Sequence, residues 1–178
     1  KRQLLARARD DGARRFVFAS SVKAMGEYTD GIADERTPCQ PATAYGRTKR
    51  EAELAVLAPD NAPLETVILR LPAVYGAGSK GNLKRMLDTV GRGRFPPLPE
   101  FGNARSMVHV DDVVDALRCC ASHSEAPGGL FLITDGARHS TRGIVLAMYE
   151  AVGREPPGWA IPRLMLSGLA RCGDVLSR

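Results

Sequence analysis

The stretch Arg15-Phe16-Val17-Phe18-Ala19-Ser20-Ser21 predicts a buried β-strand that ends on two hydroxyl groups. It is a short apolar run rich in Phe and Val, as expected for a strand covered on both faces. A helical pattern follows at residues 43–57, and a second apolar run occupies residues 64–71. A strand, a helix and a strand in this order favour a parallel sheet with crossover helices. We therefore expect an α/β protein.

Further elements are expected on both sides of this unit. Helical spacing predicts helices at 1–11, 83–90, 111–121, 141–152 and 164–172, and apolar runs predict strands at 106–110 and 130–134. A glycine-rich loop separates the second strand from the helix at 83–90. The three prolines between 96 and 99 restrict that segment to extended or turning conformations.

Composition narrows the possible partners of this 178-residue chain. Its net charge of +5 suits small anions such as diphosphates. Nucleic acid is the weaker interpretation, because the basic residues are dispersed and few aromatic residues lie among them. No apolar run is long enough to span a membrane. The four cysteines form no C-x-x-C pair, so we expect no metal site and instead buried, reduced thiols in a cytoplasmic protein.

Tyr45 and Lys49 are the first candidates for chemistry. Four positions apart, they lie one turn from each other on the same face of the expected helix. An ammonium group beside a tyrosine hydroxyl favours the phenolate, so Tyr45 could act as a general acid or base. Ser20 and Ser21 end the preceding strand. The alternative interpretation is an exposed helical pair and two hydroxyls that satisfy loop backbone, which suits Ser20 better than Ser21.

Four motifs in this order resemble one family. They are Phe-Val-Phe-Ala-Ser-Ser at 16–21, Pro-Ala-Thr-Ala-Tyr-Gly-Arg-Thr-Lys-Arg-Glu-Ala-Glu at 41–53, Ile-Leu-Arg-Leu-Pro-Ala-Val-Tyr-Gly at 68–76 and Gly-Asn-Ala-Arg-Ser-Met-Val-His-Val-Asp-Asp at 102–112. The sequence is similar to the extended short-chain dehydrogenase/reductases, in particular to the NAD-dependent epimerase/dehydratase group that acts on nucleotide sugars. The resemblance implies a Rossmann-type doubly wound parallel sheet with a small substrate-binding α/β subdomain.

The resemblance also implies a division of the chain. Residues 1–76 and 106–136 would belong to the NAD(P)-binding domain, and residues 77–105 and 137–178 to the nucleotide-sugar subdomain. The family's catalytic Ser, Tyr and Lys match Ser21, Tyr45 and Lys49. Cofactor contacts would come from Ser20, Tyr45, Lys49 and Pro72, with NAD as the cofactor and NADP not excluded.

Substrate contacts are implied for Ser21, Lys80, Asn82, Leu83 and Arg105. The expected reaction is UDP-sugar 4-epimerisation by reversible hydride transfer, with Tyr45 moving the hydroxyl proton. A 4-keto-sugar reductase of the same fold and an NAD-binding regulatory relative are the alternatives. The resemblance further implies a homodimer, paired through the helix that carries Tyr45 and Lys49.

Two departures from the family pattern matter. Ala73 stands where many relatives have an Asn that touches the sugar, so one substrate hydrogen bond is in question. The family's N-terminal G-x-x-G-x-x-G turn, which cradles the cofactor pyrophosphate, has no counterpart in this sequence. We therefore expect a fragment, inactive and weak in NADH binding when it is alone.

Overall fold

The computed structural model describes residues 2–26, 31–79 and 81–162. The chain divides into two compact units. The first consists of Lys1–Ala77 and Ser106–Ala137, and the second of Gly78–Arg105 and Arg138–Arg178.

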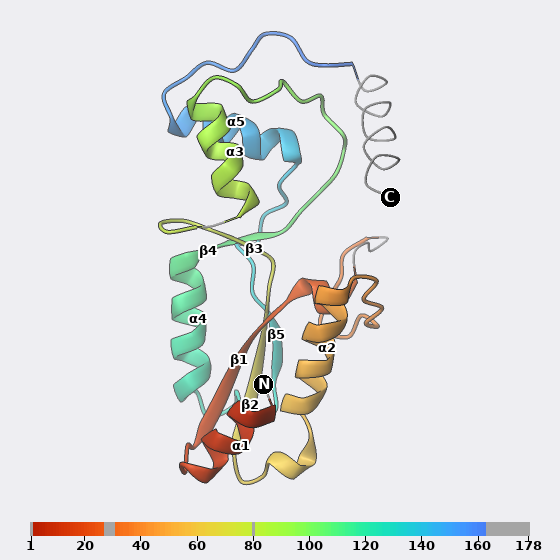
Figure 1. Ribbon diagram of the computed structural model, residues 1–178, viewed down its shortest axis with the longest axis vertical. Helices are drawn as coiled ribbons and strands as arrows, with labels where there is room; N and C mark the ends of the chain where they lie inside the picture. The colour runs from red at the N-terminus through yellow and green to blue at the C-terminus, as the bar shows by residue number, and fades with distance from the viewer. Residues whose placement is uncertain (1, 27–30, 80, 163–178) are drawn as a thin grey trace. The chain divides into compact units, whose positions relative to one another are not determined.

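A parallel three-stranded sheet is the centre of the first unit (Figure 1). Strands β1 (Arg15–Ser21), β2 (Glu65–Leu71) and β5 (Leu130–Leu132) lie in the order β1-β2-β5. In the register of β1 and β2, Ser21 pairs with Leu71, so both strands end at the same edge. The strands expected at 15–20, 64–71 and 130–134 and their parallel arrangement are confirmed.

Helices cover both faces of this sheet (Figure 1). Helices α1 (Arg2–Asp10) and α2 (Ala44–Val56) pack on one face, and α4 (Val110–Ser122) packs on the other. Successive residues of β2 point to opposite faces, as the strand geometry requires. Ile68 joins the cluster under α1 and α2, whereas Val67 and Leu69 join the cluster under α4. The result is the three-layer arrangement expected of a Rossmann-type fold.

A second, two-stranded parallel sheet pairs β3 (Ala73–Tyr75) with β4 (Met107–His109). The sequence predicts β4 but not β3. Pro72 ends β2 because its ring nitrogen cannot donate a hydrogen bond, and the chain resumes pairing one residue later with a different partner strand.

Helix α2 has well-defined ends. Thr43 is its N-cap, and the Thr43 hydroxyl accepts a hydrogen bond of 3.1 Å from the Gly46 amide. Beyond its last turn lies the short 3-10 helix η2 (Pro59–Asn61), from which the Asn61 side chain donates to the Ala55 and Val56 carbonyls. The predicted helix at 43–57 is therefore confirmed, with Thr43 as its cap.

The second unit is built on α3 (Asn82–Gly91) and α5 (Thr141–Ala151). Val90, Val145 and Tyr149 form its buried cluster. The proline-rich segment packs against this cluster, and the Tyr149 hydroxyl donates to the Phe95 carbonyl at 3.4 Å. These two helices confirm the predictions at 83–90 and 141–152. The helix predicted at 164–172 lies outside the described residues. None of the helices that the structure describes has the length and apolar character needed to cross a bilayer.

Candidate active site

The first turns of α2 run along the carboxyl end of β1. The Lys49 ammonium donates a 3.0 Å hydrogen bond to the carbonyl of Ala19, two residues before Ser21. On the other side of Ser21, α2 passes so close to Lys23 that a Cβ at Gly46 would collide with the Lys23 carbonyl oxygen. Only glycine permits this approach. These two contacts bring the start of α2 and the end of β1 together.

The side chains of Ser21, Tyr45 and Lys49 all belong to this region. Ser21 is the last residue of β1 and caps the 3-10 helix η1 (Val22–Ala24), its hydroxyl accepting from the Lys23 amide at 3.3 Å. The Lys49 nitrogen lies 5.8 Å from the centre of the Tyr45 ring. At 57% exposure, the Tyr45 side chain is accessible to a ligand rather than packed in the core.

Directly beneath these residues lies a buried charged network. The Ser20 hydroxyl donates to Glu53 of α2 at 2.6 Å. Arg70 of β2 binds the same carboxylate through two nitrogens, at 3.0 and 2.7 Å. Arg70 therefore forms a buried ion pair with Glu53. The expectation that the Ser20 hydroxyl satisfies loop backbone is wrong, because the hydroxyl is directed to Glu53 instead.

Electrostatics keep this network ionised. Burial by itself would raise the pKa of Glu53, but the hydrogen bonds from Arg70 and Ser20 outweigh burial and lower that pKa. Burial likewise opposes the charge on Arg70, yet the hydrogen bonds and charge of Glu53 raise the Arg70 pKa. The pair is a carboxylate and a guanidinium held together away from water.

Sequence reasoning assigned no role to Glu53. The available signal was its position, since Glu53 follows Lys49 by four residues and Tyr45 by eight, on the helix face that meets the sheet. A charged residue there requires a buried partner.

Pro72 lies at the same edge of the sheet as Ser21. It follows Leu71, whose register partner is Ser21. Ligands of open parallel sheets bind outside the carboxyl ends of the strands. The predicted cofactor residue Pro72 therefore stands at the edge of the sheet where a ligand is expected.

The predicted substrate residues belong to the second unit. Asn82 and Leu83 are the first residues of α3. Arg105 is exposed, and its backbone exchanges two 2.9 Å hydrogen bonds with His139. Lys80 lies outside the described residues.

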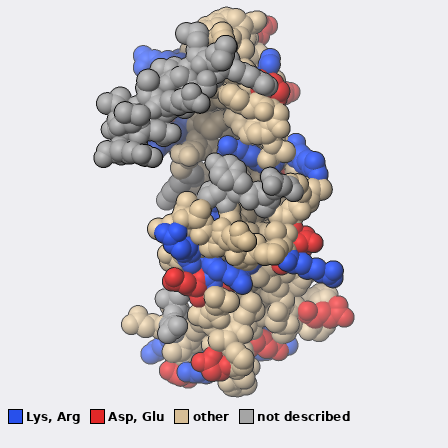
Figure 2. Space-filling view, turned by 90° about the vertical axis from the view of Figure 1, so that its right-hand side faces the viewer, with Lys and Arg blue, Asp and Glu red and all other residues tan. Residues whose placement is uncertain are grey.

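Charge is distributed unequally between the two units. The second unit carries twelve Lys or Arg against five Asp or Glu, and the first carries thirteen against fifteen. On the face seen in Figure 2, Lys and Arg side chains occur among Asp and Glu side chains.

Cys39, Cys119 and Cys120 are free thiols in the described part of the chain. Within it, no three His, Cys, Asp or Glu side chains are grouped to hold a metal ion. The expectation of buried thiols is only partly right. Cys120 is buried, but Cys39 is half-buried and Cys119 is exposed.

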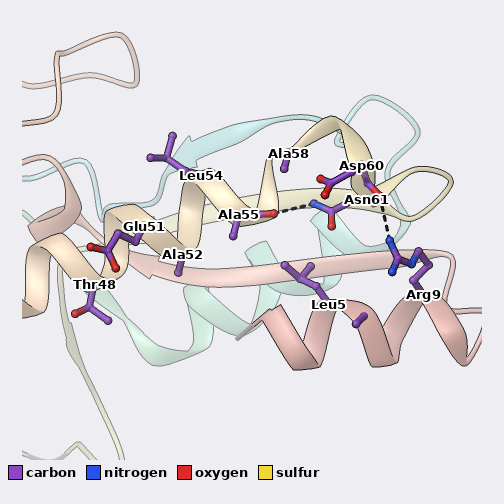
Figure 3. Close-up of a pocket in the computed structure, with 11 residues that line it drawn as sticks. Leu5, Arg9, Thr48, Glu51, Ala52, Leu54, Ala55, Ala58, Asp60 and Asn61 are labelled. Atoms are coloured by element: carbon purple, nitrogen blue, oxygen red, sulfur yellow. Dashed lines mark hydrogen bonds between the residues drawn. The ribbon is translucent and has the colours of Figure 1, made fainter.

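An open groove of about 920 Å³ lies between α1 and α2 (Figure 3). Leu5 and Arg9 of α1 face Ala52 and Ala55 of α2 across it. Its floor is mostly apolar, and neither Tyr45 nor Lys49 lines it. The groove is therefore separate from the Ser21–Tyr45–Lys49 region.

A family model described as "NAD dependent epimerase/dehydratase family" matches residues 1–133. The chain belongs to this family. It is 37% identical over 167 residues to the UDP-glucose 4-epimerase of Vibrio cholerae, a match that covers 89% of this chain and 49% of the relative.

Two solved structures extend the comparison. MoeE5 in complex with UDP-glucose and NAD has a TM-score of 0.76 and 30% identity, over 87% of this chain and 54% of MoeE5. The complex of the Thermus thermophilus UDP-glucose 4-epimerase with NAD has a TM-score of 0.70 and 27% identity, over 94% of this chain and 61% of that one. The chain thus spans about half the length of the relatives it matches.

Proposed function

We propose that this chain is the catalytic part of an NAD-dependent UDP-sugar 4-epimerase, with Ser21, Tyr45 and Lys49 as its catalytic residues. The observation that carries the proposal is the Lys49–Ala19 hydrogen bond of 3.0 Å, which fixes the Tyr45 helix against the end of β1 beside Ser21. The family membership and the UDP-glucose 4-epimerase relative support the reaction type.

The residues around Lys49 suit the nicotinamide end of NAD. An ammonium has three donors, and among the described residues only the Ala19 carbonyl accepts from Lys49. The remaining donors could bind the hydroxyls of a ribose. Pro72, and Ser20 through its backbone, would border the same pocket at the ends of β2 and β1. When bound, NAD supplies a reversible acceptor for the hydride of a sugar carbon.

Tyr45 would move the hydroxyl proton. Its phenol oxygen would take the proton of the sugar 4-hydroxyl as the hydride leaves the same carbon, and would return it when the hydride is added back to the other face. This exchange requires the phenolate form of Tyr45, and the positive charge of Lys49 lies 5.8 Å from the centre of the Tyr45 ring. The Ser21 hydroxyl would hydrogen-bond the same sugar oxygen and hold it in position.

The diphosphate of the substrate would be held by the second unit. Arg105 offers a guanidinium that can bind phosphate oxygens through two nitrogens. Lys80, Asn82 and Leu83 would contribute further contacts from the start of α3 and the residues before it. The excess of basic residues in this unit supports an anionic ligand.

The experiment is product analysis by NMR, in which purified protein containing this chain is incubated with UDP-glucose and NAD. We expect conversion to UDP-galactose. Reduction of a nucleotide 4-keto sugar by NADH, without interconversion of the two UDP-sugars, would favour the reductase alternative. Tight NAD binding without either reaction would favour a regulatory relative.

We also propose a homodimer paired through the groove beside α2. Leu4, Leu54 and Leu57 are exposed on α1 and around the end of α2, at 63%, 55% and 38%, and the groove runs between these helices. Two copies related by a twofold axis would bury the same apolar surface on each.

Light scattering after size exclusion tests this pairing. A Leu54→Glu substitution should yield monomers, because it places a charge in the apolar interface. The matched control is Val114→Glu on the exposed side of α4, where Val114 is 46% exposed. A wild-type monomer, or a dimer that survives Leu54→Glu unchanged, would contradict the pairing.

A further inference from the structure

The buried network beneath the candidate site has no part in the chemistry described above. Glu53 is 0% exposed, Arg70 is 1% exposed and Ser20 is 4% exposed. The three residues come from α2, β2 and β1 respectively. Three elements therefore meet in one buried contact, to which Arg50 of α2 adds a partly buried hydrogen bond of 3.2 Å to Glu53.

The geometry of this contact restricts how α2 can move along the sheet. Arg70 binds the Glu53 carboxylate through two nitrogens, which fixes both distance and orientation. Ser20 adds a third hydrogen bond at 2.6 Å from the neighbouring strand. A slide of α2 along β1 would break all three bonds in a site that water does not reach.

The contact lies one helical turn from Lys49. Glu53 is four residues after Lys49, and their partners Ser20 and Ala19 are adjacent on β1. Two successive turns of α2 are thus fixed to two successive residues of β1, immediately before Ser21. The position of Tyr45, one turn further on, follows from the same register.

We propose that Glu53, Arg70 and Ser20 are positioning residues that set the register of α2 on β1 and so hold Lys49 and Tyr45 at Ser21. The claim that these residues set the register of α2 depends only on the structure of this chain. The catalytic consequence rests on the function proposed above.

A contribution to the stability of the fold does not by itself explain why this site has a buried ion pair. Replacing a buried ion pair with well-packed apolar residues is often neutral or stabilising, whereas removing one partner is costly. The bidentate geometry of the Arg70–Glu53 pair fixes one arrangement of α2, whereas apolar packing would leave α2 freer to shift along the strand.

Two variants separate positioning from stability. Ser20→Ala removes a single hydrogen bond and leaves the ion pair in place. The double variant Glu53→Leu/Arg70→Met removes both charges together, so no charge remains buried and unpaired. The control is Glu65→Gln, which weakens the ion pair of Arg15 at the other end of the sheet, where Arg15 and Glu65 approach to 2.8 Å.

The measurement is the nuclear Overhauser cross-peak between the Lys49 ε-methylene and the Phe18 ring in the 178-residue chain. The Lys49 nitrogen lies 5.3 Å from the centre of that ring. The reference is the cross-peak between Tyr75 and His109, whose ring centres are 5.2 Å apart. Urea unfolding midpoints are recorded for every variant.

We expect the Lys49–Phe18 cross-peak to weaken in Ser20→Ala and to disappear in the double variant, while the Tyr75–His109 cross-peak stays in both. Glu65→Gln should shift the unfolding midpoint and leave both cross-peaks unchanged. An unchanged Lys49–Phe18 cross-peak in a folded double variant would overturn the proposal. If the double variant does not fold, an unchanged Lys49–Phe18 cross-peak in Ser20→Ala would overturn the proposal.

Kinetics of active protein containing this chain complete the test. The double variant should lose about a hundredfold in kcat with KM little changed, because a displacement of about 1 Å at the reacting groups has an effect of this size. A double variant with wild-type kcat would also overturn the proposal. If the wild type has no epimerase activity, the proposed function fails while the cross-peaks still report on the register.

Discussion

Two buried arginines stand at opposite ends of the same sheet and show what separates a structural ion pair from one beside a candidate site. Arg15 begins β1 and pairs with Glu65, which begins β2. Arg70 lies near the end of β2 and pairs with Glu53 of α2. Both arginine side chains are almost fully buried, at 4% and 1% exposure.

Their partners differ. Arg15 also donates to the carbonyls of Cys120 and His123, so it satisfies the carboxyl end of α4 and fixes that helix to the sheet. Its carboxylate partner Glu65 is 32% exposed and reaches solvent. Glu53 is fully buried, and its other hydrogen bonds come from Ser20, the neighbour of Ser21, and from Arg50 on the same helix.

The position of each ion pair at the sheet, and not the type of pair, therefore decides its role. At the amino end of the parallel strands, the arginine joins the starts of β1 and β2 to the end of α4, at the opposite end of β1 from Ser21. At the carboxyl end, where ligands of such sheets bind, the Arg70–Glu53 pair joins the helix of Tyr45 to β2, and the Ser20 hydrogen bond joins that helix to the strand of Ser21.

The largest difference in stability should follow from removing each carboxylate. Glu53→Gln leaves a buried guanidinium without its counter-charge and should lower the free energy of unfolding by about 3–5 kcal/mol. Glu65→Gln should lower it by about 1 kcal/mol or less, because Glu65 is partly solvated and Arg15 keeps two carbonyl acceptors. Urea denaturation of both variants measures the difference. Equal losses would remove the distinction between the two ends.

Acid should destabilise the folded chain by protonating Glu53 of the buried Glu53–Arg70 pair. The pKa of Glu53 in the folded chain is lowered from its ordinary value of 4.5, so the unfolded chain takes up this proton more readily. The stabilisation from Glu53 is therefore complete above about pH 4.5 and is lost as the pH falls through the lower, folded pKa.

Unfolding midpoints between pH 7 and pH 3 check this dependence. The wild-type midpoint should fall more steeply below pH 4.5 than that of Glu53→Gln, which has no carboxyl at this position. Parallel curves for the two proteins would assign the acid sensitivity to other groups.

A smaller difference is expected from two serines. Ser20→Ala removes a buried hydrogen bond to a carboxylate and should lower the free energy of unfolding by about 1–2 kcal/mol. Ser122→Ala, at the amino end of the sheet, removes exposed bonds to the Arg118 and Cys119 carbonyls and should change it by less than about 0.5 kcal/mol. Thermal or urea unfolding distinguishes the two. A larger loss at Ser122 would reverse the comparison.

Much of the fold could be predicted because local patterns determine it. The Phe-Val-Phe run of β1, the cap at Thr43 and the spacing of Tyr45 and Lys49 are all local signals, and the structure has the strand, the helix and the shared face. The short strand β3 was missed because its three residues follow a proline and pair with a segment more than thirty residues away.

Long-range pairings account for what the sequence did not show at the candidate site. Nothing near Glu53 in the sequence indicates that Arg70 and Ser20 will meet it, since Arg70 is 17 residues ahead and Ser20 is 33 residues behind. The need for Gly46 likewise depends on the Lys23 carbonyl, which only the folded chain brings near. Such contacts follow from the register of strands and helix, which local propensity does not encode.

The rate of UDP-glucose epimerisation by a Tyr45→Phe variant of protein that contains this chain decides whether Tyr45 transfers the proton. Removing the phenol oxygen should lower kcat by about 10²–10⁴-fold and leave KM for UDP-glucose nearly unchanged. The matched control is Tyr75→Phe, whose ring packs on His109 and whose phenol oxygen has no part in the proposed proton transfer, and it should keep nearly full activity. A Tyr45→Phe variant with kcat within about threefold of the wild type would contradict the assignment of proton transfer to Tyr45.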